Sequence, residues 1–130
     1  AFIGAAHAIG SLQSVGVKGV LMCDNKPASD VKLKLYDVDI GPIDDLLDEM
    51  KSRADGSFEL KGHATEITAI DPKLNIYHDC NDEFPCQRRI SISIPDSYIS
   101  TGPTPRRIYD AGTIQLSGKW AGEKRDCFNR

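Results

Sequence analysis

Short runs of alternating apolar and polar residues are the feature that most constrains how this chain can fold. A period of two residues is the signature of a half-buried β-strand. Turn-forming residues such as Asp, Asn, Gly and Pro separate the runs. The strand-like runs cover residues 15–23, 31–36, 46–51, 57–61, 74–79, 89–94 and 108–116. About seven short strands at near-regular spacing predict an all-β protein, an antiparallel β-sandwich or open barrel.

Residues 46–51 leave two interpretations open. Asp44 and Asp45 could begin a short helix. A strand would instead continue to Asp55-Gly56, and an Asp-Gly pair between two runs is a strong hairpin signal. We favour the hairpin, and expect residues 62–72 to be a connection and the residues after 116 to be a tail.

Composition limits the number of domains and the classes of partner. With 130 residues, 40% of them hydrophobic and 27% charged, the chain fits one globular domain. Sixteen Lys and Arg against 19 Asp and Glu give a net charge of −3. A nucleic-acid binder would need a basic excess, so we expect no such partner. The apolar stretches are also far too short for a membrane-spanning segment.

The first eight residues differ from the rest because they are small, apolar and uncharged. Ala6-His7-Ala8 has the form of a signal-peptidase site. We therefore predict that residues 1–8 are a signal-peptide remnant, that the domain covers residues 9–130, and that the protein is secreted. A short buried strand is the alternative for residues 1–8.

Several motifs resemble the nematode transthyretin-like family. The most specific is Ile-Tyr-His-Asp-Cys at residues 76–80. Others follow in the family's order at residues 13–19, 31–36, 55–58, 110–114 and 125–127, so the resemblance covers residues 13–127. It implies a small, secreted transthyretin-like sandwich with two disulfides. Within the family, the chain is similar to the member that bridges phosphatidylserine on dying cells to an engulfment receptor.

The four cysteines are expected to form these two disulfides. If consecutive strands alternate in direction, Cys23, the loop from Cys80 to Cys86, and Cys127 all lie at one end of the sandwich. Five residues separate Cys80 from Cys86, a spacing that suits a staple within a hairpin loop. We therefore predict the pairs Cys80–Cys86 and Cys23–Cys127. A zinc site is the competing interpretation, but the chain has no Cys-x-x-Cys motif.

An acidic loop is a candidate calcium site. Asp37, Asp39, Asp44 and Asp45 lie close together in the sequence, and carboxylate oxygens are ligands that Ca²⁺ prefers. The spacing matches no EF-hand loop, and two other interpretations compete. Acidic residues in a loop increase solubility, and Asp44-Asp45 could cap a helical turn.

A basic strand face is the candidate lipid-binding site. In a transthyretin-like sandwich, the strands around residues 31–37, 45–52, 73–80 and 88–94 would share one sheet. Near a charged membrane, each basic side chain contributes about 1 kcal/mol of attraction to anionic headgroups. We expect the outer face of that sheet to bind lipid, and assign Tyr77 to a partner protein. The predicted lipid contacts are Lys32, Lys34, Lys51 and Arg89.

Catalysis is not expected. The chain has no Gly-x-Ser-x-Gly motif, and His78 falls on the inward set of its strand. The hydroxyisourate hydrolases of the transthyretin superfamily end in Tyr-Arg-Gly-Ser, whereas this sequence ends in Cys-Phe-Asn-Arg. A zinc- or His-dependent hydrolase is therefore the weakest hypothesis.

The leading hypothesis is a secreted, non-enzymatic adaptor that binds phosphatidylserine and a cell-surface receptor, as in the clearance of apoptotic cells. The alternative is a carrier of a small hydrophobic ligand, which would need an apolar cavity or an oligomer channel. The oligomeric state stays open, and no cofactor other than calcium is expected.

Overall fold

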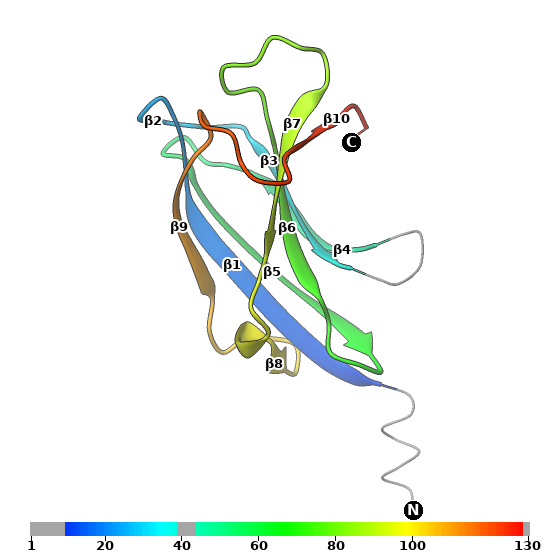
Figure 1. The fold of residues 1–130 in the computed structure, drawn as a ribbon. Coiled ribbons are helices and arrows are strands. Elements are labelled where there is room, and N and C mark those ends of the chain that lie inside the picture. The colour runs from blue at the N-terminus through cyan, green and yellow to red at the C-terminus, as the bar shows by residue number, and fades with distance from the viewer. Residues whose placement is uncertain (1–9, 39–43, 129–130) are drawn as a thin grey trace, which may run out of the picture.

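Two facing β-sheets make up the fold in the computed structural model, which describes residues 10–38 and 44–128 (Figure 1). The predicted signal remnant at residues 1–8 and Asp39 lie outside the described residues. A 3₁₀ helix, η1, covers Asp96–Tyr98. The strands are β1 (Ser11–Cys23), β2 (Lys26–Pro27), β3 (Lys32–Asp37), β4 (Asp45–Lys51), β5 (Ser57–Glu66), β6 (Pro72–His78), β7 (Gln87–Ser93), β8 (Ser100–Thr101), β9 (Tyr109–Gln115) and β10 (Lys124–Asp126).

Sheet A is built around the long strand β1. That strand pairs with β5, β2 and β8 in antiparallel directions and with β9 in parallel. Sheet B has the order β10-β7-β6-β3-β4, with every pair antiparallel. The all-β sandwich is therefore confirmed, and so is the sharing of one sheet by β3, β4, β6 and β7. The parallel β1–β9 pair departs from the antiparallel expectation, because the chain reaches β9 from the other sheet through η1 and β8 rather than by a hairpin.

The inward residues of the two sheets fill the space between them. Leu33 and Leu35 of β3 are fully buried, as their alternation with lysines predicts. Burial of each such side chain stabilises the fold by about 1.5–3 kcal/mol. The core contains Val15, Val17, Leu21, Leu33, Leu35, Phe58, Leu60, Ile70, Leu74, Ile76, Ile90, Ile94, Ile114 and Leu116.

Residues 46–51 form a strand, but the hairpin predicted for Asp55-Gly56 is wrong. Gly56 has a φ of 83° and makes the turn, yet it joins β4 in sheet B to β5 in sheet A. An Asp-Gly pair specifies a tight turn and does not specify which sheet the next strand enters.

Side chains, not a backbone ladder, join β4 to β5 at this edge. Asp48 Oδ2 accepts a hydrogen bond from the Lys61 amide at 3.0 Å. A glycine at position 62 allows the close approach, because a Cβ there would lie 2.6 Å from Cβ of Leu47. The strand β5 also continues to Glu66 through residues expected to be a connection, since its ladder with β1 runs as far as Ser11.

The structure contradicts the predicted disulfide pairing. Cys23 pairs with Cys80, and Cys86 pairs with Cys127. The predicted clustering of the four cysteines at one end is correct, since β2, the loop between β6 and β7, and β10 lie at the same end (Figure 1).

Strand register explains why Cys86 selects Cys127. In the ladder between β10 and β7, Asp126 lies opposite Gln87, so the next pair outward is Cys127 and Cys86, with Cα atoms 4.4 Å apart. This ladder lies in the segment that was predicted to be a tail, so the sequence did not indicate it. Cys23 then bridges the end of sheet A to Cys80, just after β6.

Candidate functional site

A row of basic side chains crosses the outer face of sheet B. Residues opposite one another in a ladder project from the same face. The strand registers therefore place five residues in one row, which we call the basic row: Lys51, Lys32, Tyr77, Arg89 and Lys124. Three of the four predicted lipid contacts lie in it. Lys124 was missed because it belongs to β10, which has no apolar residue to mark it as a strand.

Outside the basic row, the outer face carries both signs of charge. The next row contains Glu49, Lys34, Asn75 and Ser91, and the following one Tyr36, Lys73 and Ser93. Near the end of the basic row, Asp126 lies 3.3 Å from Nη1 of Arg89. The three rows and Asp126 together hold six basic side chains and two carboxyl groups, namely Lys32, Lys34, Lys51, Lys73, Arg89 and Lys124 against Glu49 and Asp126. Asp44 adds a third carboxyl group beside Lys73. This excess contrasts with the chain's net charge of −3.

Two predicted contacts on this face prove to be covered. Lys34 is 6% exposed and Tyr77 is 3% exposed, so neither is a surface contact as predicted. The Lys34 Nζ lies 5.8 Å from the centre of the Tyr77 ring, a distance at which a cation–π contact is favourable. Long side chains on adjacent strands lie across one another here, and alternation within one strand does not predict such packing.

Hydrogen bonds tie this covered cluster together. Ser91 Oγ donates to Asn75 Oδ1 at 2.7 Å, and Asn75 Nδ2 donates to Tyr77 Oη at 3.1 Å. Burial, with a smaller contribution from Tyr77, raises the pKa of Tyr36 to about 12. The centre of the face is therefore covered and, apart from Lys34, uncharged, and the accessible cations lie toward its edges.

The accessible part of the basic row includes a small hollow at one edge of sheet B. Lys51 and Lys124 are exposed, and Lys32 and Arg89 are half-buried. Lys32, Glu49, Met50 and Lys51 line a hollow of about 250 Å³. Two lysines and one glutamate are thus among the residues that line a space of small-molecule size.

At the disulfide end, Arg88 joins the loop between β6 and β7 to the segment between β9 and β10, from the inner side of sheet B. It is 7% exposed and donates to both carboxylate oxygens of Glu123, at 2.8 and 2.7 Å. It also donates to the carbonyl oxygens of Cys80 and Gly118. The hydrogen bonds that Arg88 donates to Glu123 hold the pKa of that carboxyl group below its usual range.

His78 is a core residue, in agreement with its inward position. It is 2% exposed, and its Nδ1 accepts a hydrogen bond from the Cys80 amide at 3.0 Å. Burial, and then the charge of Arg88, lowers the pKa of His78 to about 4. The imidazole is neutral at physiological pH.

Acid should destabilise the protein through His78. Its pKa falls from 6.5 to about 4 on folding, so between these values the unfolded chain binds the proton and the folded one does not. Stability is lost as pH falls through this window, by about 3 kcal/mol at most. Urea unfolding at pH 7, 5.5 and 4 should show a steeper loss for the wild type than for His78→Gln, and equal losses would contradict the assignment.

The structure brings together only part of the predicted acidic cluster. Asp37 and Asp45 lie opposite each other across β3 and β4, and they are joined by Glu66, which lies outside the predicted acidic loop. Asp44 lies 3.8 Å from Lys73.

Among the described residues, no helix has the length and apolar character needed to cross a membrane.

Several known proteins similar to this chain belong to one family. A model of the transthyretin-like family matches residues 18–95. Transthyretin-like protein 5 of Caenorhabditis elegans is 58% identical over 123 residues, covering 93% of this chain and 88% of that protein. Transthyretin-like protein 33 of the same organism is 52% identical over 120 residues, 91% of this chain and 84% of that protein. Transthyretin-like protein 2 is 44% identical over 128 residues, 93% of this chain and 86% of that protein.

Proposed function

The chain belongs to the transthyretin-like family, and we propose that it is a secreted, non-enzymatic adaptor that binds phosphatidylserine through the outer face of sheet B. A cell-surface receptor would bind elsewhere, as in the bridging role that the resemblance to the engulfment member implies. The observation that carries the proposal is the basic row, which spans all five strands of sheet B in an acidic chain.

The hollow beside Lys32 and Lys51 matches the chemistry of a phosphatidylserine headgroup. That headgroup carries a phosphate, a carboxylate and an ammonium group. Lys32 and Lys51 are suited to the two anionic groups, and Glu49 to the ammonium group. The hollow is lined by these three residues and Met50, so it offers both signs of charge in one place.

The remaining cations of the basic row favour a membrane over an isolated headgroup. Lys124 lies at the far edge of sheet B from Lys51, so a flat anionic surface can contact both. Each such side chain contributes about 1 kcal/mol near a charged membrane. Salt screens exposed charges over about 8 Å at physiological ionic strength, so binding should weaken as salt increases.

Secretion and the absence of catalysis are parts of the same proposal. Two disulfides join the four cysteines, and such bonds persist in oxidising compartments. The buried neutral His78 lacks access to a substrate. Sheet A lies on the other side of the core, and its strand β9 pairs with β1 alone among the described residues, which leaves a separate surface for a receptor.

Reversing the charge of Lys51 and Lys124 should abolish most vesicle binding. Both residues are exposed, so Lys51→Glu/Lys124→Glu should keep its melting temperature. Four units of charge are lost, and at about 1 kcal/mol per lysine removed the affinity should fall by roughly thirtyfold or more. Flotation with phosphatidylserine-containing vesicles, at low and physiological salt, measures this.

A control with the same change of charge lies on sheet A. Lys18 and Lys26 are exposed on β1 and β2, and Lys18→Glu/Lys26→Glu should bind vesicles much more tightly than the sheet B variant. Equal losses in the two variants would mean that net charge, not this face, governs binding. Equal binding of the wild type to phosphatidylcholine vesicles would refute anionic lipid recognition.

A further inference from the structure

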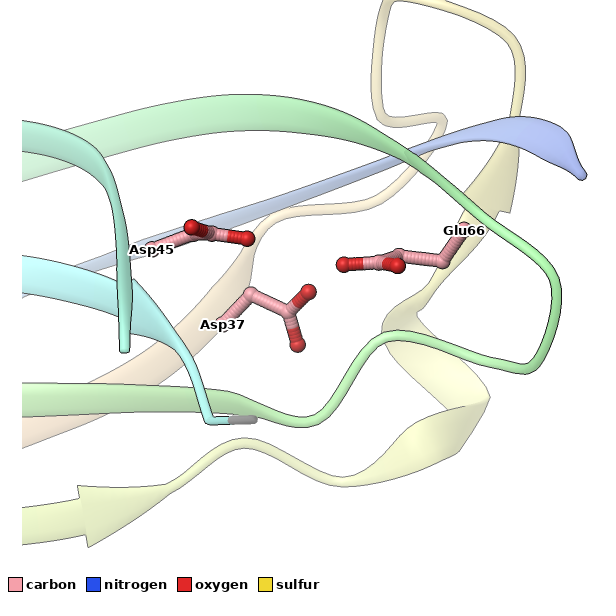
Figure 2. Close-up of side chains that lie close together, drawn as sticks. All are labelled: Asp37, Asp45 and Glu66. Carbon is pink, nitrogen blue, oxygen red and sulfur yellow. The ribbon is translucent and has the colours of Figure 1, made fainter. Parts of the chain in front are cut away.

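Three carboxyl groups from three strands converge at the end of the sandwich where β3, β4 and β5 meet. Asp37 ends β3, Asp45 begins β4 and Glu66 ends β5. One oxygen from each lies within 4.8 Å of the others. Figure 2 shows the three side chains pointing toward one another.

Asp37 is the feature that most needs a counter-charge. It is 2% exposed, and its Oδ1 accepts a hydrogen bond from the Asp71 amide at 2.8 Å. Its Oδ2 is buried and has no hydrogen-bond partner among the described residues. A buried carboxylate oxygen without a partner is costly, and this one belongs to a side chain directed into the cluster (Figure 2).

The register adds a second unfavourable contact. Asp45 lies directly opposite Asp37 in the β3–β4 ladder, and like charges in directly opposite positions destabilise a strand pair. Glu66 adds a third carboxyl group from the other sheet. A cation among the three would satisfy Asp37 Oδ2 and turn the repulsion into attraction.

We propose that Asp37, Asp45 and Glu66 bind one calcium ion, which links the β3–β4 hairpin of sheet B to the end of β5 in sheet A. Ca²⁺ binds oxygen ligands at about 2.3–2.6 Å, so two ligands on opposite sides of one ion lie about 4.8 Å apart. Three carboxylates supply part of its coordination shell, and water supplies the rest. Ca²⁺ suits a site with ligands from three strands better than Mg²⁺, which requires near-ideal octahedral geometry.

Calorimetric titration of the wild-type protein with CaCl₂, in the absence of lipid, tests the site independently of the proposed membrane function. We expect one ion per chain and a dissociation constant of about a millimolar or below. At a hundredfold excess over that constant, the melting temperature should rise by roughly 5–10 °C relative to EDTA. No heat and no shift at about 10 mM Ca²⁺ would overturn the proposal. So would binding of Mg²⁺ as tight as that of Ca²⁺.

Two variants and a control identify the ligands. Asp45 is exposed and Glu66 is half-buried, so Asp45→Asn and Glu66→Gln should fold even if Asp37→Asn does not. Each should weaken Ca²⁺ binding by about tenfold or more, because each removes one charged ligand. Glu83→Gln makes the same chemical change in the loop at the other end and should bind as the wild type does.

The response of Asp45→Asn in EDTA distinguishes a metal site from a purely structural cluster. Without a cation, this variant should melt no lower than the wild type, because it removes the like charge opposite Asp37. With Ca²⁺ it should melt lower. A variant that is less stable than the wild type in EDTA, or that keeps the full Ca²⁺ response, would overturn the assignment.

Discussion

Replacing Arg88 with methionine is expected to lower the free energy of unfolding by about 3–5 kcal/mol, or the melting temperature by roughly 10–20 °C. Arg88 is 7% exposed, and removal of its guanidinium leaves the Glu123 carboxylate without its bidentate partner. The carbonyl oxygens of Cys80 and Gly118 lose their donor as well. Urea unfolding of Arg88→Met measures the loss.

Two further variants show whether the loss comes from an uncompensated charge. Arg88→Met/Glu123→Leu should recover part of the stability, because no unpaired carboxylate remains. Lys61→Met breaks an exposed ion pair with Glu59, at 3.2 Å, and should cost at most about 1 kcal/mol. An Arg88→Met variant as stable as Lys61→Met would contradict the role given to Arg88.

Removing the Cys23–Cys80 disulfide should lower the free energy of unfolding by about as much as Arg88→Met does. Its ends are 57 residues apart, for which the loop-entropy model gives about 4 kcal/mol. The Cys86–Cys127 bridge spans 41 residues and gives nearly the same figure. Cys80 is part of the core and Cys23 packs against it, so Cys23→Ala/Cys80→Ala should lose more stability than Cys86→Ala/Cys127→Ala.

Peptide mapping without reduction checks the pairing itself. A protease specific for glutamate cleaves after Glu83, between Cys80 and Cys86. The fragments should then show Cys80 joined to Cys23 and Cys86 joined to Cys127. A fragment that joins Cys80 to Cys86 would contradict the pairing in the structure. Equal stabilities of the two double variants and the wild type would contradict the stabilising role given to the disulfides.

Alternation within single strands predicted the fold but not the packing between strands. Leu33, Leu35, Leu74 and Ile76 follow a period of two and are all buried. By the same alternation, Lys34 lies on the outer face. It is nevertheless buried, because its side chain packs against Tyr77 of the neighbouring strand β6. A residue's neighbours across strands depend on register, which one strand's sequence does not encode.

In the candidate sites too, some residues could be predicted from the sequence and others could not. Lys32, Lys51 and Arg89 were placed on one face because the family resemblance supplied the strand order, and the ladders bring them into one row. Lys124 was missed because β10 has three residues and no hydrophobic signal. Glu66 was missed because β5 extends five residues beyond the expected strand end at residue 61, into a polar segment.

The central claim is that the outer face of sheet B recognises the phosphatidylserine headgroup. The most direct measurement is a titration of the isotope-labelled protein with a short-chain, water-soluble phosphatidylserine, followed by the backbone amide signals in NMR spectra. We expect the largest shifts at the amides of Lys32, Glu49 and Lys51, with smaller shifts along the basic row. Shifts confined to sheet A, or an equal response to short-chain phosphatidylcholine, would contradict it.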